Sequence, residues 1–578
     1  MTFEGFESDT WEALPGAGRL TMAQREAIES DEPLLCVVAG AGAGKTRVLT
    51  LRVARRVREG SIEADRTLVT TFSRKAAEEL RTRLWSLGVA GVKAGTFHRT
   101  ALGLLREHRE LRGRPAPQLL PDRRRLLAKV TTGDPRRTRI LDGEIGWAKA
   151  RLVTPERYQG EARRHRRRSG INPDQVAEAY ARYEAERTRR RLLDFDDLIV
   201  ACADALSGDS EFADSIRWRT RHLFVDEMQD VNPAQFRLLT AMLADEPDLF
   251  VVGDPNQSVY GFNGADPTLL ERLPEILRGT KVIQLDENHR CTPQVVAVAT
   301  AVLREGGSSS GADAVVPPRT TRIDGPVPKV VAHATDDVEA AWAATRAKMS
   351  RTPGRRWSSV AVLTRTNAQL VKVKDAMDAA NVPSLVAGSD LGPASDLRSA
   401  PARGVADRGD ADRGDADRGD ADRGDADREN ADRDDTNRDD ADRPPAPFAG
   451  DHVVLTTFHR AKGLQWPTVI VLGLGEGYMP IASAQTDAAL EEERRLLYVA
   501  LTRSEEELWC SWFERTGGEA VTGIAPPRGP SPWLQPIERT ITRLEKEAAP
   551  TSASEVAARV AELRKRLAEG VEGADVQR

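Results

Sequence analysis

Short runs of apolar residues alternate with stretches of helical period over residues 34 to about 110, and again over residues 222 to 304. The alternation predicts an α/β fold with parallel sheets. We expect buried strands at Leu34–Ala39, Thr67–Thr71, His222–Val225 and Leu249–Val252. In such sheets, ligands bind at the carboxyl ends of the strands, so we expect a site in the turns that follow these strands.

A second α/β unit is indicated further along the chain, by the apolar runs Ser359–Thr364, Val453–Thr457 and Val469–Leu472. The first unit is interrupted by residues 111–195, which are helical in pattern and rich in arginine. The stretch from Pro121 to Arg168 holds 15 Lys or Arg against 6 Asp or Glu. A solvated helix face is the ordinary explanation of such a charge run, and contact with duplex DNA or a nucleic acid backbone is the alternative.

The second unit is itself divided by a repetitive segment that has no globular character. The pentapeptide Ala-Asp-Arg-Gly-Asp repeats from Ala406, and residues 406–443 hold 16 acidic residues against 8 arginines. A stacked β-solenoid would need an inward apolar residue in each repeat, and that place holds only Asp and Arg. We interpret this segment as a solvated, disordered linker. Its net charge of -8 exceeds the -5 of the whole chain, so the remainder of the chain is mildly basic, at about +3.

A last helix is expected from Glu555 to about Glu569, where Ser552 and Glu555 form a capping-box pattern and Gly570 can end the helix. Its apolar face, formed by residues that include Val556 and Leu563, suits docking on the same protein. Binding of a partner protein, such as a repair or transcription protein, is the alternative.

The composition argues against several classes of protein. The four cysteines lie far apart with no paired spacing, which disfavours a zinc ribbon, an iron–sulfur cluster or a disulfide framework; they are Cys36, Cys202, Cys291 and Cys510. No window approaches twenty uninterrupted apolar residues, and the first nine residues carry acidic rather than basic side chains. We expect a soluble, cytoplasmic protein with no membrane partner.

The first candidate site is the glycine loop Gly40–Thr46, which follows a predicted strand and precedes a helical stretch from Arg47 to Glu59. Inward-turned backbone N–H groups and the amino end of a helix make an anion site. Lys45 would reach the β- and γ-phosphates and Thr46 would hold magnesium. The strict phosphate-loop pattern has glycine at the position of Ala39, so an ordinary glycine-rich turn is the alternative for this segment taken alone.

Two adjacent carboxylates, Asp226 and Glu227, follow the strand predicted at His222–Val225. Asp226 can bind magnesium, and Glu227 can orient and deprotonate an attacking water. An isolated Asp-Glu pair is a common charged turn. Its occurrence together with the glycine loop, each after an apolar strand, predicts a site that hydrolyses a nucleotide.

With these two motifs and others, the chain resembles the UvrD/Rep/PcrA helicases of superfamily 1. The resemblance extends over most of residues 20 to 535, and the motifs occur in the same order as in that family. The matching segments are Leu20–Arg25, Thr70–Ala77, Gly95–His98, Leu193–Asp197, Val225–Asp230, Val252–Gly264, Glu287–Arg290, Leu363–Gln369, Thr456–Leu464 and Glu491–Arg503. The resemblance implies an ATP-dependent 3′-to-5′ DNA helicase or single-stranded DNA translocase, acting in DNA repair, replication or recombination on single-stranded and tailed duplex DNA. A translocase that displaces proteins with little unwinding is one alternative, and a non-catalytic DNA-binding adaptor is another.

The same resemblance implies an α/β fold of two RecA-like motor domains with parallel sheets, a helical insertion in the first, and the disordered linker in place of the usual inserted subdomain of the second. We expect the first motor domain over 1–110 and 196–280, the insertion over 111–195, the second motor domain over 281–390 and 448–535, the linker over 391–447 and a helical tail over 536–578.

By resemblance, ATP and Mg²⁺ lie between the two domains. The residues implied to hold the nucleotide are Gln24, Gly40, Ala41, Gly42, Ala43, Gly44, Lys45, Thr46, Arg47 and His289, with Thr46 and Asp226 on the metal. The implied catalytic residues are Lys45, Glu227, Gln257, Arg290 and Arg503. Guanidinium groups suit this role because phosphoryl transfer spreads negative charge over the γ-phosphate oxygens.

Binding of single-stranded DNA needs aromatic platforms for bases, and the family's motif positions suggest Phe72, His98, Tyr260, Phe262 and His459. Ordinary core packing is the alternative for each. Some positions depart from the family pattern: His289 replaces an adenine-stacking tyrosine, Gln465 a glutamate near the sugar, and Phe262 with Asn263 a tryptophan and an arginine. These departures concern positions that would determine the affinity for nucleotide and for DNA. The hydrolytic residues are unchanged.

Overall fold

The computed structural model describes residues 11–131, 133–304, 318–352, 354–387, 450–522 and 526–548. The linker expected over 391–447 and the helix expected from Glu555 to about Glu569 lie outside the described residues. Among the described helices, none combines the length and the apolar character that a membrane crossing requires.

The first domain is built on six parallel strands in the order β3-β2-β6-β7-β1-β8. Their bounds are β1 Leu34–Ala39, β2 Thr67–Thr71, β3 Lys93–Thr96, β6 His222–Val225, β7 Asp248–Gly253 and β8 Lys281–Leu285. One hydrophobic cluster joins the sheet to α1 Met22–Glu29, α2 Lys45–Arg58 and α3 Arg74–Ser86. A second joins the other face to α4 Phe97–Leu111, α9 Phe195–Gly208, α10 Ser210–Arg219, α11 Pro233–Met242, α12 Thr268–Glu271 and α13 Leu273–Ile276.

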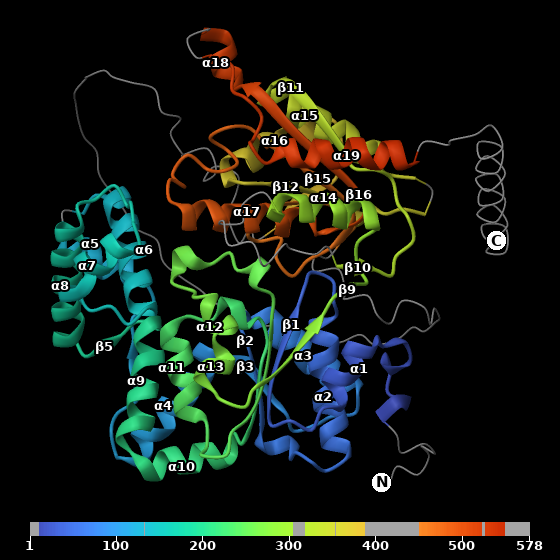
Figure 1. Cartoon of the computed structure of the whole chain (residues 1–578). Helices are drawn as coiled ribbons and strands as arrows, with labels where there is room; N and C mark the ends of the chain where they lie inside the picture. The colour runs from blue at the N-terminus through green and yellow to red at the C-terminus, as the bar shows by residue number, and fades with distance from the viewer. Residues whose placement is uncertain are drawn as a thin grey trace, which may run out of the picture.

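The second domain repeats this plan, with six parallel strands in the order β11-β16-β15-β12-β14-β13. The bounds are β11 Lys329–Thr335, β12 Val360–Thr364, β13 Ser384–Val386, β14 Val453–Thr457, β15 Trp466–Val471 and β16 Ser504–Arg515. One face packs on α14 Pro293–Arg304, α17 Asp487–Leu501 and α19 Leu534–Ala548, and the other on α15 Asp336–Met349 and α16 Asn367–Ala379. Figure 1 shows the two layered α/β domains one above the other. They are the two RecA-like domains that the sequence predicts.

A helical insertion extends to one side of the first domain (Figure 1). It consists of α5 Arg123–Val130, α6 Pro135–Ala150, α7 Pro155–Arg164 and α8 Pro173–Arg189, closed at its base by the short pair β4 Gln118–Leu119 and β5 Leu192–Leu193. Three of these helices begin with proline, whose fixed φ suits a first turn. The insertion has its own hydrophobic cluster around Leu127, Ile145 and Tyr183.

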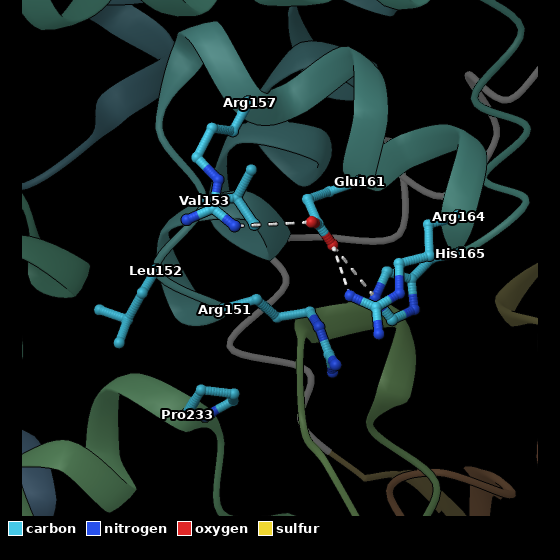
Figure 2. A pocket seen from close by; sticks show the side chains of 8 residues that line it. All are labelled: Arg151, Leu152, Val153, Arg157, Glu161, Arg164, His165 and Pro233. Atoms are coloured by element: carbon cyan, nitrogen blue, oxygen red, sulfur yellow. Dashed lines mark ion pairs between the residues drawn. The ribbon is translucent and has the colours of Figure 1, made fainter.

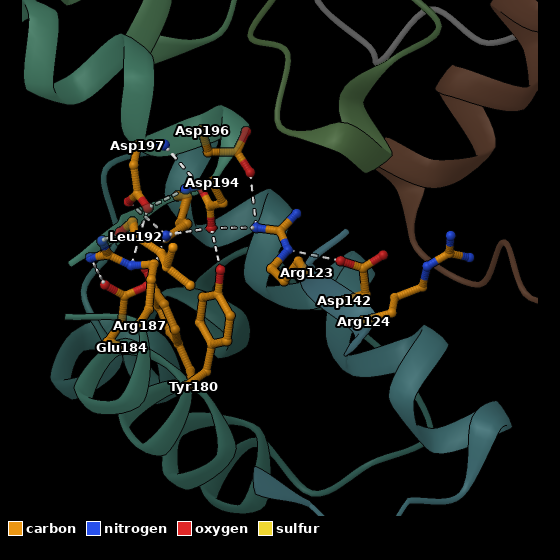
Figure 3. A network of polar contacts seen from close by, with 12 residues as sticks. Arg123, Arg124, Asp142, Tyr180, Glu184, Arg187, Leu192, Asp194, Asp196 and Asp197 are labelled. Carbon is orange, nitrogen blue, oxygen red and sulfur yellow. Dashed lines mark hydrogen bonds and ion pairs between the residues drawn. The ribbon is translucent and has the colours of Figure 1, made fainter. Parts of the chain in front are cut away.

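A buried polar network ties this insertion to α9 of the first domain (Figure 3). Three acidic side chains, Glu184, Asp194 and Asp197, approach one another closely enough to suggest a metal site. The ammonium of Lys149 occupies their centre, at 2.8, 2.7 and 2.7 Å from one oxygen of each. Their charge is therefore compensated by a side chain of α6, and the network is a structural junction rather than a metal centre.

Two of the expected domain limits differ from the packing of the described residues. β8 pairs with β1 from Leu35↔Lys281 onward, so the first sheet continues past the expected limit at residue 280. The tail expected from residue 536 begins inside the second domain, because Ile537 and Ile541 of α19 are buried in its hydrophobic cluster. Other short elements include β9 Glu287–Asn288, β10 Arg319–Thr320 and α18 Gly517–Thr522.

Candidate active site at the junction of the two domains

The glycine loop lies between β1 and α2, as its sequence context predicts. Gly42 and Gly44 have φ angles of +71° and +82°, a left-handed conformation that side chains rarely adopt. A Cβ at Gly42 would also lie 2.8 Å from the Cβ of Arg290, and one at Gly44 would lie 2.9 Å from Nε2 of Gln24. Both glycines are therefore favoured by conformation, and Gly42 also by space, and the loop forms a backbone cradle at the amino end of α2.

Lys45 begins α2 and points back along the loop. Its Nζ donates to the carbonyl oxygens of Ala39 and Gly40 at 3.1 and 3.3 Å. The same Nζ lies 3.9 Å from Oδ2 of Asp254, a buried carboxylate at the end of β7. The ammonium is thus held inside the cradle, where an anionic phosphate would be compensated by it.

Gln24 and His289 close one side of the loop. Gln24 forms a capping box with Thr21 at the start of α1, and its Nε2 donates to the carbonyl oxygen of Ala43 at 2.9 Å. This Nε2 also lies 3.2 Å from Nε2 of His289, whose backbone N–H donates to the carbonyl oxygen of Gly42 at 2.9 Å. Burial lowers the pKa of His289, which favours the neutral ring. A neutral, planar side chain beside an amide suits the base of a nucleotide. Arg47, by contrast, donates to the carbonyl oxygen of Gly16 at 3.0 Å and braces the loop from outside.

The two adjacent carboxylates behave differently. Burial and the neighbouring Glu227 raise the pKa of Asp226 to about 7. Burial acts on Glu227 in the same sense, but the ammonium groups of Lys462 and Lys45 outweigh it and hold the pKa of Glu227 below its usual range. Glu227 also has a positive φ of +54°, which is uncommon for a side chain other than glycine. The nearby cations thus keep Glu227 charged at the end of β6.

The donor set at this place suits a magnesium ion. Asp226 supplies a buried carboxylate and Thr46, in the first turn of α2, supplies a hydroxyl. Hard oxygen ligands of this kind are those that Mg²⁺ prefers. A cation would stabilise the charged form of Asp226, which burial otherwise disfavours. The residues therefore fit the ion that the sequence suggests.

Arg503 and Gln257 meet across the junction. Arg503 lies at the end of α17 in the second domain and is 1% exposed. Its Nη2 donates to Oε1 of Gln257 at 3.4 Å, and Nε2 of Gln257 donates to Oδ2 of Asp254 at 2.6 Å. Burial lowers the pKa of Arg503 to about 9. These hydrogen bonds link Arg503 of the second domain to Asp254, the carboxylate that also faces Lys45. Arg290 lies over Gly42, with its Cβ where a side chain of that residue would be.

Further contacts join the two domains around this site. Ala41 of the glycine loop and Val259 are buried in the hydrophobic cluster of the second domain. Nε of Arg495 donates to the carbonyl oxygen of Ser258 at 2.9 Å. Nζ of Lys462 donates to Oδ2 of Asp230 at 2.6 Å and to the carbonyl oxygen of Gln257 at 2.7 Å. The candidate site is therefore assembled by docking, not by either domain alone.

Four of the five aromatic side chains suggested for DNA form one continuous row. Phe72 stacks on Tyr260, with ring centroids 5.0 Å apart and an interplanar angle of 18°. Tyr260 lies 6.2 Å from Phe262, which lies 5.5 Å from His459 of the second domain. We call these four side chains the aromatic row. Phe72 and Phe262 are 42% and 47% exposed, so apolar ring surface is available to bases. Burial lowers the pKa of His459 to about 4, so its ring is neutral near pH 7.

The fifth, His98, is not part of this row. Its ring lies 6.3 Å from Phe195, which is 49% exposed at the start of α9. The structure thus adds Phe195 to the candidates and sets it apart with His98. The signal available in the sequence was that Phe195 is an aromatic residue inside the matched segment Leu193–Asp197.

Most arginines of the basic insertion are engaged in ion pairs. Arg123 and Arg167, for example, pair with Asp142 and Glu144 at 2.8 and 2.7 Å. A small pocket lies where α6 and α7 approach α11; the residues around it include Arg151, Arg157, Glu161, Arg164 and His165 (Figure 2). Arg157 and Arg164 are mostly exposed there and lie 3.7 and 3.9 Å from a single carboxylate, that of Glu161. In this pocket the two exposed guanidinium groups share one carboxylate, so their positive charge is only partly compensated.

The comparisons with known proteins agree with the motifs. A family model described as the UvrD/REP helicase N-terminal domain matches residues 20–276, and the UvrD-like helicase C-terminal domain matches residues 283–390 and 439–515. The ATP-dependent DNA helicase UvrD2 of Mycobacterium tuberculosis is 34% identical over 576 residues, which cover 87% of this chain and 81% of that relative. The ATP-dependent DNA helicase PcrA of Leuconostoc citreum is 31% identical over 384 residues, covering 63% of this chain and 49% of that relative. PcrA of Staphylococcus epidermidis is 30% identical over 387 residues, with 63% and 50% covered.

Proposed function

Because the chain belongs to the UvrD/REP helicase family, we propose that it is an ATPase that moves along single-stranded DNA and unwinds tailed duplexes from 3′ to 5′. The observation that carries this proposal is the shared junction. The candidate hydrolytic site and the aromatic row both lie where the two domains meet, and both take side chains from each domain. An enzyme in which one docking event completes both sites can couple hydrolysis to a step on DNA.

In the proposed mechanism, Glu227 accepts a proton from the water that attacks the γ-phosphate. Lys45 and Arg503 stabilise the charge that develops on the γ-phosphate oxygens, and Gln257 links Arg503 to the first domain. Mg²⁺, held by Thr46 and Asp226, would neutralise phosphate charge and orient the reacting group. Gln24 and His289 would contact the base of the nucleotide. Opening of the junction removes Arg503 from this site, so hydrolysis depends on closure.

The aromatic row is proposed to stack the bases of single-stranded DNA, and Arg157 with Arg164 to contact its backbone or a neighbouring duplex. A translocase that displaces proteins with little unwinding would use the same residues, so it remains the second candidate function. A non-catalytic adaptor is disfavoured because Lys45, Glu227, Arg290 and Arg503 are all present. Action in the cytoplasm, and a partner protein on the C-terminal tail, belong to the same proposal.

One experiment tests the proposal. ATP hydrolysis by the purified protein is measured with and without single-stranded DNA, beside unwinding of a 3′-tailed and a 5′-tailed duplex. We expect strong stimulation by single strands and unwinding of the 3′-tailed substrate alone. Stimulation without unwinding would favour the translocase, and hydrolysis that ignores DNA would refute the proposal.

A further inference from the structure

Lys462 is a buried cation of the second domain, and the hydrogen-bond and ion-pair partners of its ammonium in the described residues belong to the first domain. It follows β14, in the turn that also carries His459. Its side chain is 7% exposed, and its Nζ lies 2.6 Å from Oδ2 of Asp230 and 2.7 Å from the carbonyl oxygen of Gln257. Oε2 of Glu227 lies 4.0 Å away. This single ammonium therefore contacts the carboxylate cluster that holds the proposed catalytic base.

The same ammonium also touches the aromatic row. Nζ of Lys462 lies 5.2 Å from the centroid of the Tyr260 ring, in cation–π geometry. Tyr260 is the middle member of the row, since it stacks on Phe72 and neighbours both Phe262 and His459. A base that stacks in this row must share or displace ring contacts of Tyr260. The position of Lys462 is thus sensitive to what occupies the row.

The carboxylate of Asp230 depends on Lys462 for its charge compensation. The second carboxylate oxygen of Asp230, Oδ1, is buried and has no hydrogen-bond partner within the described part of the chain. The first oxygen depends on Lys462. A buried charge pair of this kind is stable only while its geometry is kept, so a shift of the ammonium changes the surroundings of Asp230 and Glu227 together.

We propose that Lys462 is a positioning residue through which DNA bound on the aromatic row sets the orientation of Glu227 and so raises the rate of ATP hydrolysis. The proposal rests on the proposed function, because it presupposes a DNA-stimulated ATPase. Lys462 touches neither ATP nor, in this proposal, DNA. It acts by linking Tyr260 to the acidic cluster across the domain junction.

The test compares Lys462→Met, which keeps the length of the side chain and removes its charge, with Lys462→Arg, which keeps the charge. Steady-state ATPase is measured without DNA and with saturating oligo(dT), and the affinity for labelled oligo(dT) is measured by fluorescence anisotropy. We expect Lys462→Met to lower the ratio of stimulated to unstimulated kcat about tenfold or more, while KM for ATP and Kd for oligo(dT) change by less than about threefold. Lys462→Arg should recover a large part of the ratio, which a purely structural defect would not allow.

Lys329→Met is the matched control, since Lys329 forms an exposed ion pair with Glu545 in the same domain. It should leave the ratio unchanged. If Lys462→Met does not fold, Asp230→Asn carries the test, because it removes the partner charge and should lower the same ratio. Where both variants fold, their double variant should lose less than the product of the two single losses.

The outcomes separate the two proposals. A parent protein that oligo(dT) does not stimulate refutes the proposed function. A stimulated parent together with a Lys462→Met variant of equal ratio overturns only the role of Lys462. A variant whose oligo(dT) affinity falls as much as its ratio overturns it as well, because Lys462 would then be a DNA contact.

Discussion

At the candidate hydrolytic site, the first domain supplies four carboxylates beside Lys45, and the second domain supplies cations that reach them. Asp226, Glu227, Asp230 and Asp254 are all at the carboxyl ends of β6 and β7 or just beyond them. The second domain supplies Lys462, Arg495 and Arg503, which donate hydrogen bonds to residues of the first domain. Each set would be poorly satisfied alone, because a buried charge without a partner is costly. The division of charge therefore makes closure of the junction, and not either domain, the unit that completes the site.

This comparison also explains why neighbouring carboxyls differ. Burial raises the pKa of Asp226 and of Asp230 to about 7 each. For Glu227 the cations Lys462 and Lys45 outweigh burial, and its pKa is lowered. Glu227 must be charged near neutral pH to act as the base, and it is the carboxylate of the cluster that depends most on cations. The second domain supplies one of these cations, Lys462.

Removal of Arg503 from the second domain should have the largest effect on hydrolysis. Arg503→Ala is expected to lower kcat on the order of a thousandfold, since a guanidinium matters most as charge develops on the γ-phosphate. Binding of ATP should weaken much less. Steady-state kinetics and nucleotide binding by fluorescence or calorimetry check this.

Arg495→Ala serves as the control for that variant. Arg495 also crosses the junction, but its Nε donates to the carbonyl oxygen of Ser258, whereas Arg503 donates to the side chain of Gln257. A comparable loss of kcat in both variants, or an equal loss of kcat and of ATP binding in Arg503→Ala, would indicate a structural role for Arg503.

Removal of one charge from the first domain should have the next largest effect. Glu227→Gln keeps the shape of the side chain and removes the base, so we expect hydrolysis to fall about a hundredfold or more while ATP binding survives. Single-turnover hydrolysis and equilibrium binding measure the two effects separately. Hydrolysis near the parent rate would show that another group accepts the proton.

The aromatic row differs from the charged residues of the junction, because its members carry no charge near pH 7 and come from both domains. Phe262→Ala should weaken binding of single-stranded DNA about tenfold, in line with about 1–3 kcal/mol for a base stacked on an aromatic ring. Trp85→Ala is the control, since Trp85 is 77% exposed on α3 and is not a member of the row. Anisotropy with labelled oligo(dT) gives both affinities. Equal affinities for Phe262→Ala and the parent would assign the row to packing alone.

Much of the fold could be predicted from apolar periodicity. The strands at Leu34–Ala39, Thr67–Thr71, His222–Val225 and Val453–Thr457 are confirmed with their expected bounds. β16 was not predicted, because Glu505, Glu506 and Glu507 interrupt its apolar pattern near its start. In the described part of the chain, two of these glutamates meet arginines, Arg355 and Arg346, that only the tertiary fold brings near.

The candidate site divides in the same way. The glycine loop and the Asp226–Glu227 pair are local patterns, so sequence alone could single them out. Lys462 and Asp230 were not singled out, although both lie in matched segments, because they are 232 residues apart and meet only when the domains dock. The separation of His98 from the aromatic row has the same origin, since sequence spacing does not give the relative place of two loops.

The smallest expected effect concerns a buried carboxyl that faces no cation. Oε1 of Glu339, in α15, accepts hydrogen bonds from Oγ of Ser511 and the backbone N–H of Gly473 at 2.6 and 3.0 Å. Both donors are neutral, and burial raises the pKa of Glu339 from 4.5 to about 7. The folded state therefore binds a proton more tightly than the unfolded state. The free energy of unfolding should fall as the pH rises from about 4.5 to about 7, and this loss should level off above the folded pKa.

Glu339→Gln removes that ionisation and keeps an acceptor for both donors. The cost in the parent is on the order of 2–3 kcal/mol, so the Tm of the variant relative to the parent should increase by a few degrees between pH 5 and pH 8. Glu519 provides the contrast, because it pairs with Arg528 and its pKa is lowered to about 2. The Tm difference of Glu519→Gln should not grow over the same range, since Glu519 is already ionised throughout it. Thermal melts of both variants at several pH values decide the matter. A Tm difference for Glu339→Gln that stays constant with pH would mean that Glu339 is charged in the folded protein, so that a buried carboxylate here needs no cation, and the contrast with the junction would be lost.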